Sequence, residues 1–534
     1  MKVSLCQINT IVGNFKYNKK KILKYYTDCI SSNIDIVVFP ELTITGYPPQ
    51  DLLKNDEFLK ENINALNDIA KKTTIPLIIG YVREDGGKIY NSAAICYDGK
   101  LQSSYDKILL PTYDVFDELR YFTSGLKPRI IKIPIQGKNI NVGLQICEDL
   151  WDHNYDCKVS SIQKELGAEM LINISASPYH KERLMKRRSI IEDKVKALNL
   201  PFLYCNMVGA QDELIFDGQS IAISENNDII AYGNSFQEEI VIVDTDSKKG
   251  INIDFPSKLE KTYNALCLGV KDYFFKTRHD EALIGLSGGI DSALVASIAS
   301  DALGPDKVHG ISLPSKYSSD HSLKDAKSLA TSLGIDYKVI PIQNSVDEME
   351  NTLRPHFQGH PPNVAEENIQ ARIRGNILMA LSNKFGWMVL STGNKTEMAL
   401  GYCTLYGDMS GGLSVISDIS KLDVYALSNW INTIHPGRIP KGSIDKPPSA
   451  ELSPGQVDPF DYNIVSPIVD AIIEDGKTDI DLKKTGLEED LVDLLYRKVR
   501  MSEFKRRQAA PGLRVSTKAF GIGRRFPIVN HFEN

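Results

Sequence analysis

The most constraining feature of this 534-residue sequence is a series of short, strongly apolar segments separated by helical or loop-like stretches. In the first half they include DIVVFP (35–40), PLIIGYV (76–82), NVGLQIC (141–147), EMLINIS (169–175) and PFLYCN (201–206). Segments this apolar are typical of strands buried on both faces, which need a covering layer on each side. The first half is therefore predicted to form a layered α/β domain.

A second series follows a polar, turn-rich segment at residues 244–258, and a chain this long exceeds one hydrophobic core. Its strand-like runs are ALIGLS (282–287), VHGISLP (308–314), YKVIPI (337–342) and WMVLSTG (387–393). Strands that alternate with helices predict a doubly wound parallel sheet, whose ligands bind at the carboxyl ends of the strands. We assign residues 1–245 to the first domain, 246–262 to a linker and 263–534 to the second domain. An amphipathic helix is expected over Lys261–Lys276.

Composition excludes several classes of protein. The chain is 42% hydrophobic and 24% charged, with a formal net charge of −6, so its surface as a whole does not attract nucleic acid. No apolar run approaches the roughly 20 residues of a membrane span, and the N-terminus suits a first strand better than a signal peptide. The eight cysteines are scattered, which favours free thiols in a reducing compartment. We expect a cytoplasmic location, small-molecule substrates, and no nucleic-acid or membrane partner.

Three segments of the first domain each place a reactive side chain at the end of an expected apolar strand: Glu41 in VVFPELTITGY, Lys107 in YDKILLPTYD and Cys147 in NVGLQICEDLW. Singly, each has an ordinary interpretation, because charges after strands are usually solvated and lone cysteines usually belong to the core. Together they supply what a thiol needs to attack an amide: a base, a positive charge for the oxyanion, and a proton source. Their order and flanking sequences resemble the Glu–Lys–Cys triad of the nitrilase superfamily over nearly all of residues 1–245.

That resemblance implies an αββα sandwich and gives each member of the triad a role. Cys147 would be the nucleophile that forms a thioester, Glu41 the general base, and Lys107 the stabiliser of the tetrahedral intermediate. Four further positions would complete a glutamine site: Glu118 as a second acid beside the triad, with Tyr113, Ser177 and Arg183. An arginine suits the carboxylate of glutamine.

In the second domain, ALIGLSGGIDSALVASIA (282–299) predicts a buried strand, a tight loop and a helix start. Glycines let backbone N–H groups surround a phosphate, and the helix N-terminus adds partial positive charge. The loop lacks the GK[ST] ending of a Walker A motif, and a purely structural glycine-rich turn is the alternative. It resembles the pyrophosphatase loop of synthetases that split ATP into AMP and pyrophosphate. The resemblance implies ATP as co-substrate, held by Ser287, Gly288, Gly289, Ile290, Asp291 and Ser292, with Asp291 also binding Mg²⁺.

Further segments narrow the class of synthetase. The stretches 368–383, 390–412, 446–456 and 505–527, with SDISKLDVYAL around Lys421, resemble the NAD synthetases and cover most of residues 263–534. The resemblance implies that Glu397 joins Asp291 as a Mg²⁺ ligand. It also implies that ATP is contacted by Arg374 and Thr392, and deamido-NAD by Asn368, Asp408 and Lys421.

Joined in one chain, the two halves resemble the family of glutamine-dependent NAD synthetases. The resemblance implies that deamido-NAD is adenylated by Mg-ATP and then amidated by ammonia from glutamine. Three alternatives stay open: another AMP-forming amide ligase with a nitrilase-type amidase, an amidase joined to an unrelated nucleotide enzyme, and a nucleotide-binding scaffold with decayed sites. GMP and asparagine synthetases are disfavoured, because their glutaminases use a Cys–His–Glu set or an N-terminal cysteine, and position 2 is Lys2.

The assembly is expected to be a homo-oligomer, a dimer or an octamer, because NAD synthetase domains are generally paired. The C-terminal stretch is basic, with KRRQ and GRRFP, in a chain of net charge −6. These arginines either form a solvated tail or become ordered against anionic ligands or a neighbouring chain. We favour ordering, because Phe504, Phe520 and Phe526 lie among the charges and would be costly to expose together.

Overall fold

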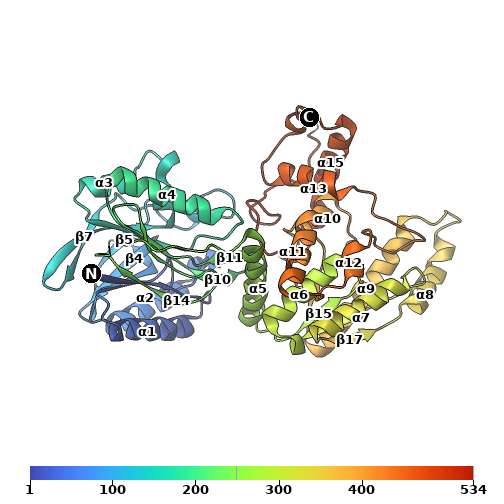
Figure 1. Cartoon of the computed structure of the whole chain (residues 1–534), viewed down its shortest axis with the longest axis horizontal. Coiled ribbons are helices and arrows are strands. Elements are labelled where there is room, and N and C mark those ends of the chain that lie inside the picture. The colour runs from blue at the N-terminus through green and yellow to red at the C-terminus, as the bar shows by residue number, and fades with distance from the viewer. Residues whose placement is uncertain (248, 533–534) are drawn as a thin grey trace. The chain divides into compact units, whose positions relative to one another are not determined.

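The computed structural model describes residues 1–247 and 249–532. It divides the chain into two compact units, Met1–Ser257 and Lys258–Asn534 (Figure 1). Both units contain sheets with helices packed on them, which confirms the predicted α/β class. Among the helices of the described residues, none combines the length and the hydropathy that a membrane span needs.

In the described part of the first unit, two six-stranded sheets and a hairpin form. The first sheet has the order β14 (Glu239–Asp244), β1 (Lys2–Gln7), β2 (Ile36–Val38), β3 (Leu77–Asp85), β4 (Lys88–Tyr97) and β5 (Lys100–Asp106). The second has the order β13 (Ile229–Tyr232), β12 (Ile221–Ile223), β9 (Phe202–Asn206), β8 (Met170–Ser175), β7 (Lys138–Ile146) and β6 (Ile130–Ile135). The hairpin joins β10 (Val208–Gln211) to β11 (Leu214–Asp217). The central strands β1–β3 and β7–β9 run parallel.

These sheets form the inner layers of a sandwich. Val3 and Leu5 of β1 meet Leu144 of β7 in an apolar cluster between the sheets. On its outer face the first sheet packs against α1 (Phe15–Ser31) and α2 (Asp56–Ala70), and the second packs against α4 (Arg183–Leu198). Figure 1 shows α3 (Val159–Glu165) beside α4, and α1 and α2 on the other side of the strands. The predicted αββα sandwich is confirmed, and two covered faces explain why the central strands are almost wholly apolar.

The strand before Lys107 differs from the expectation. β5 has the sequence KLQSSYD and is largely exposed at the edge of its sheet, so the prediction of an apolar strand here was wrong. An edge strand tolerates polar side chains because one of its sides has no neighbouring strand. The apolar run at residues 108–110 belongs to the loop that follows the strand.

The second unit has one parallel sheet in its described residues, in the order β17 (Asp336–Val339), β16 (Val308–Ser312), β15 (Ala282–Gly285), β18 (Met388–Ser391) and β19 (Leu413–Ser414). The helices among these strands are α6 (Ile290–Leu303), α7 (Asp320–Leu333), α8 (Gln343–Leu353), α9 (Val364–Phe385) and α10 (Lys395–Leu400). The strand order reverses between β15 and β18, so a cleft for ligands is expected at their carboxyl ends.

Further helices complete this unit. α5 (Lys258–Thr277) and α11 (Lys421–Ile434) pack on α6. The C-terminal helices are α12 (Lys441–Asp445), α13 (Tyr462–Ile473), α14 (Asp479–Lys483), α15 (Glu489–Met501) and α16 (Glu503–Arg506). Because α5 begins at Lys258, the last part of the segment 246–262, expected to be a linker, is helical.

The C-terminal arginines are ordered by contacts within the chain. Arg506 is buried and donates hydrogen bonds to the carbonyls of Met398 and Ala399, at 3.2 and 2.8 Å. Glu503 pairs with Arg506 and also with Arg524, each at 2.8 Å. The stretch is ordered as expected, but the partners in the described residues are carbonyls and a carboxylate of this chain, and Phe504 stays 42% exposed.

Candidate active sites

Three loops of the first unit bring the predicted triad together. Glu41 follows β2 and Lys107 follows β5, both in the first sheet, whereas Cys147 follows β7 in the second sheet. All three side chains are buried. The backbone N–H of Ala176, directly after β8 in the second sheet, donates to Glu41, so the carboxyl ends of β2 and β8 meet at this site.

Lys107 is the centre of this cluster. Its Nζ donates hydrogen bonds to Glu41 Oε1 and Glu118 Oε1, each at 2.8 Å. Glu41 also accepts from Asn91 Nδ2 at 2.7 Å and from the backbone N–H of Ala176 at 2.9 Å. One ammonium therefore lies between two carboxylates, and Glu41 is fixed by three donors.

Burial shapes the protonation of the cluster. It would lower the pKa of Lys107 by itself, but Glu118 and Glu41 raise that pKa well above its usual value, so the ammonium stays charged. Burial raises the pKa of Glu118 to about 7 against the opposing effect of Lys107. Burial and the charge of Glu41 raise the pKa of the Cys147 thiol well above its usual range. The Cys147 thiol is thus neutral at rest and would need a base to react, and Glu41 is the carboxylate whose charge acts most strongly on it.

Cys147 occupies a strained turn at the end of β7. Its backbone φ of 44° lies in the left-handed region, which residues other than glycine rarely adopt. Asn173 Nδ2 donates to the Cys147 carbonyl at 3.3 Å, which holds the turn from one side. The neighbouring Glu148 is buried and accepts from the hydroxyls of Tyr113 and Tyr155, each at 3.0 Å.

Two of the residues predicted to bind glutamine, Arg183 and Ser177, contact each other. Arg183 Nε donates to Ser177 Oγ at 3.0 Å, and the guanidinium stacks on the Trp151 ring at 3.9 Å. Burial, with the charge of Arg187, lowers the pKa of Arg183. No carboxylate of residues 1–247 or 249–532 forms a salt bridge with it, which suits a group that binds the carboxylate of a substrate. Tyr113 is 47% exposed, and its hydroxyl donates a hydrogen bond to Glu148, the residue after Cys147.

In the second unit, the SGGIDS loop joins β15 to α6 as predicted. Gly288 has a φ of +79°, and a Cβ there would lie 2.3 Å from the carbonyl oxygen of Ser322, so the backbones approach too closely for any other residue. The Ser292 hydroxyl donates to the Gly289 carbonyl at 3.0 Å, and the Gly289 N–H donates to Ser287 Oγ at 3.2 Å. The loop thus presents two hydroxyls and a helix N-terminus at the carboxyl end of β15.

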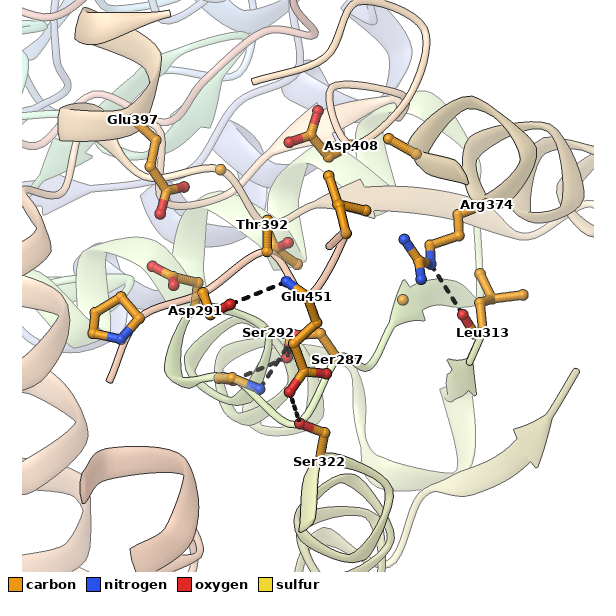
Figure 2. A pocket seen from close by; sticks show the side chains of 18 of the residues that line it. Ser287, Asp291, Ser292, Leu313, Ser322, Arg374, Thr392, Glu397, Asp408 and Glu451 are labelled. Atoms are coloured by element: carbon orange, nitrogen blue, oxygen red, sulfur yellow. Dashed lines mark hydrogen bonds between the residues drawn. The ribbon is translucent and has the colours of Figure 1, made fainter. Parts of the chain in front are cut away.

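A cavity of about 300 Å³ opens above this loop, where the strand order reverses. The predicted residues that line it are Ser287, Gly289, Ile290, Asp291, Ser292, Arg374, Thr392, Glu397, Asp408 and Lys421. Figure 2 shows Asp291 and Glu397 on one side of this cavity and Arg374 on the other. Gly288 and Asn368 are not among the lining residues. Asn368 Oδ1 instead accepts a hydrogen bond from Thr404 at 2.6 Å.

The two predicted metal ligands, Asp291 and Glu397, both form an ion pair with the ammonium of one lysine. Lys421 Nζ lies 2.5 Å from Asp291 Oδ2 and 3.2 Å from Glu397 Oε1. Asn394 Nδ2 donates to Asp291 Oδ1 at 2.9 Å, and its Oδ1 accepts from the N–H of Glu397 at 3.0 Å. Burial raises the pKa of Glu397 to about 7, against the effect of Lys421. Lys421 therefore lies against the carboxylates, a contact that the sequence did not predict.

Other predicted residues are fixed by the walls of the cavity. Arg374 Nε donates to the Leu313 carbonyl at 3.0 Å, and burial lowers the pKa of the guanidinium to about 10. Asp408 accepts from the N–H of Thr404 at 2.6 Å, and burial raises its pKa to about 6. Both side chains are thus held at the cavity wall, with their charges shielded from water.

Sequence reasoning missed several residues that hold these sites. In the first unit they are Asn91, Glu148 and Asp149. In the second they are Asn394, together with Lys446 and Glu451, which line the cavity and form an ion pair with each other. Asn394 carried a detectable signal, because Asn-x-x-Glu after a strand is a capping-box pattern, and the structure has that box at the start of α10. The contacts of Asn91 with Glu41 and of Asp149 with Ile108 join residues 50 and 41 positions apart, so no local sequence pattern predicts them.

Comparisons with known proteins give the same division of the chain. Residues 2–252 match the carbon-nitrogen hydrolase family, and residues 262–509 match the NAD synthase family. The glutamine-dependent NAD(+) synthetase of Thermotoga maritima is 40% identical, covering 100% of this chain and 99% of that protein. The chain belongs to the glutamine-dependent NAD(+) synthetase family. The Synechocystis member is 41% identical over 99% of both chains.

Solved structures of this family share the fold. The glutamine-dependent NAD+ synthetase of Acinetobacter baumannii in complex with adenosine diphosphate is 35% identical, with a TM-score of 0.80 over 99% of this chain and 98% of that one. The synthetase of Cytophaga hutchinsonii has a TM-score of 0.84 over 99% and 98%, at 20% identity. The predicted family and fold class are both confirmed.

Proposed function

We propose that this chain catalyses the ATP-dependent amidation of deamido-NAD to NAD, with ammonia taken from glutamine. The observation that carries the proposal is that one chain holds two complete sets of reactive groups. The first unit has a buried thiol with a carboxylate and an ammonium. The second has a phosphate-type loop beside two carboxylates in a cavity.

In the glutaminase unit, Glu41 would accept the proton of the Cys147 thiol as the sulfur attacks the amide carbon of glutamine. Lys107 is held by Glu41 and Glu118, so its charge would stabilise the oxyanion as it forms. The protonated Glu41 would return its proton to the leaving ammonia, and water would then hydrolyse the thioester. Arg183 and Ser177 would bind the carboxylate of glutamine, with Tyr113 at the same site.

In the synthetase unit, ATP would lie in the cavity with its phosphates on the SGGIDS loop. The hydroxyls of Ser287 and Ser292 and the N-terminus of α6 favour negative charge there. The carboxylate of deamido-NAD would attack the α-phosphorus, which gives an acyl-adenylate and pyrophosphate. Arg374 and Thr392 would orient ATP, and Asn368, Asp408 and Lys421 would bind deamido-NAD.

Magnesium fits the donors at this site. Asp291 and Glu397 already share one cationic group, Lys421 Nζ, and their oxygens are the hard ligands that Mg²⁺ prefers. The described residues contain no group of three or more ligating side chains, so the ion would take further ligands from phosphate and water. When bound, it would supply positive charge to the departing pyrophosphate.

The two activities need each other chemically. At neutral pH most ammonia is ammonium, which has no lone pair, so hydrolysis of glutamine would supply the unprotonated nucleophile that displaces AMP. We further propose that the enzyme works in the cytoplasm as a homo-oligomer. The alternative is another glutamine- or ammonia-dependent AMP-forming amide ligase.

The test separates the two units with one substitution. Cys147→Ala removes the thiol, so NAD formation from glutamine should be lost while NAD formation from ammonium persists. Liquid chromatography of NAD, AMP and glutamate, with Mg-ATP and deamido-NAD present, measures both. A variant that still uses glutamine well would contradict the nitrilase assignment, and failure of the wild type to consume deamido-NAD would favour the alternative ligase.

A further inference from the structure

We propose that Asp149 is a positioning residue. It fixes the backbone beside Lys107 in one sheet relative to the backbone beside Cys147 in the other. The inference deepens the proposed function, because it rests on Cys147 being the glutaminase nucleophile. Asp149 lies two residues after Cys147 in the short helix Cys147–Leu150 and is completely buried.

One carboxylate oxygen holds the segment that follows Lys107. Asp149 Oδ1 accepts hydrogen bonds from the backbone N–H groups of Ile108 at 3.1 Å and Leu109 at 2.9 Å. These residues come directly after β5, where the ladder of the sheet has ended. Asp149 therefore accepts the backbone hydrogen bonds that a neighbouring strand would otherwise accept from the loop after Lys107.

The other oxygen holds the turn that carries the nucleophile. Asp149 Oδ2 accepts from the backbone N–H of Ile146 and from the hydroxyl of Tyr105, each at 3.0 Å. Ile146 immediately precedes Cys147, and Tyr105 belongs to β5. A single rigid carboxyl group thus contacts both strands that end at the reactive residues.

The strain at Cys147 explains why such a clamp is needed. A residue other than glycine keeps a left-handed backbone φ, as Cys147 does, only where the surrounding structure holds it in place. Asp149 fixes the residue before Cys147, and Asn173 fixes the carbonyl of Cys147 itself. No lysine, arginine or histidine of the described residues forms a salt bridge with Asp149, so this buried charge is met by neutral donors. Burying an anion contributes little to the free energy of folding, so we assign Asp149 a role in positioning the two reactive residues.

Asp149→Asn tests the role, because an amide has one accepting oxygen and must release one of the two pairs of donors. We expect kcat for glutamine hydrolysis to fall about a hundredfold with KM changed less than about threefold. NAD formation from ammonium should stay within about twofold of wild type. The rate at which iodoacetamide alkylates Cys147 should fall, and its pH dependence should shift, because Glu41 and Lys107 no longer lie as they did against the thiol.

Asp152→Asn is the matched control, since Asp152 is also buried, lies on the same loop and pairs with Lys194 at 2.6 Å. It should keep the wild-type alkylation profile. An unchanged kcat and profile in Asp149→Asn, or the same losses in Asp152→Asn, would overturn the proposal. If Asp149→Asn does not fold, Tyr105→Phe decides, because it removes one donor: a reduced kcat with unchanged KM supports the role, and wild-type behaviour overturns it.

Cys147→Ala is assayed alongside. If that variant still hydrolyses glutamine, the proposed function and the role of Asp149 both fall. If it is inactive while Asp149→Asn behaves like the wild type, only the role of Asp149 falls.

Discussion

At the scale of single residues, Lys107 illustrates how burial and charge are balanced. A buried ammonium is costly alone, and a buried carboxylate equally so, but two carboxylates around one ammonium keep a net negative charge beside the thiol. Burial, and after it the charge of Glu41, raises the pKa of Cys147, so the thiol is protonated at rest and the proposed mechanism needs a base. In the proposed mechanism, the thiol of Cys147 therefore loses its proton as the sulfur attacks. The cluster does not keep a thiolate at rest.

Glu118 gives this cluster a pH dependence with a definite sign. Burial raises the pKa of Glu118 to about 7, so the carboxyl is charged above that pH and protonated below it. Protonation removes one of the two charges that hold Lys107, and we expect glutamine hydrolysis to decline as pH falls through about 7. Glu118→Gln imitates the protonated form, so its kcat should be low and flat over that range. Glutamate release measures both profiles; an equally steep acid limb in the variant would assign it to another group.

Asp291 and Glu397 make a second prediction at this scale. Asp291→Ala or Glu397→Ala removes a proposed Mg²⁺ ligand, so adenylation should fail with either nitrogen source, by about a hundredfold or more. Pyrophosphate release from labelled ATP measures it, and glutamine hydrolysis reports on the intact first unit. Asp301→Ala is a control on the same helix, because Asp301 pairs with Arg438 near the other end of α6. Pyrophosphate release at the wild-type rate in the Asp291 variant would refute the ligand role.

At the scale of elements, the loop between β15 and α6 depends on one glycine. Gly288→Ala should abolish synthesis of NAD with either nitrogen source, because its Cβ would meet the Ser322 backbone. Gly386, at the end of α9, has the same φ of +79° but nothing within 4 Å of an added Cβ. Gly386→Ala should therefore cost only about 1 kcal/mol of backbone strain and keep its activity. Thermal unfolding and NAD assays compare the two; equal losses would mean that strain, and not the collision, matters.

Elements also mark the limit of what the sequence predicts. The loops after β2, β7 and β15 were predictable, because strands covered on both faces are apolar and end abruptly at Glu41, Cys147 and Ser287. β5 was not, since an edge strand carries no such pattern. The contacts of Asp149 with Ile108 and of Lys421 with Asp291 were likewise not predictable, because these partners lie 41 and 130 residues apart in the chain. Pairing at that distance is decided by tertiary packing, which periodicity does not report.

At the scale of the whole molecule, the net charge of −6 hides a strongly basic C-terminus. Arg506 and Arg524 converge on Glu503, and their guanidinium groups lie over Phe520, at 4.7 and 5.9 Å from its centroid. Composition predicted ordering from the neighbouring aromatic residues, and the partner proves to be this chain's own carboxylate. A basic segment in an acidic protein is therefore not by itself evidence of an anionic ligand.

Assembly is the prediction that belongs to this scale. α9 leaves Val364, Met379 and Phe385 more than a third exposed, and a partner chain that covered them would remove this apolar area from water. We expect a homo-oligomer, so light scattering at working concentration should give a multiple of the 59.5 kDa chain mass. A single-chain mass that persists with substrates present, in active enzyme, would contradict this expectation.

The position of the triad across two sheets has a consequence for how the first unit can be divided. Glu41 and Lys107 follow strands of one sheet, and Cys147 follows a strand of the other. The complete set of proposed catalytic groups is therefore present only when both sheets are packed together, and neither sheet alone holds it. If the first unit were split between Lys107 and β6, Cys147 would lie on a different fragment from Glu41 and Lys107, so glutamine hydrolysis would require the two fragments to reassociate.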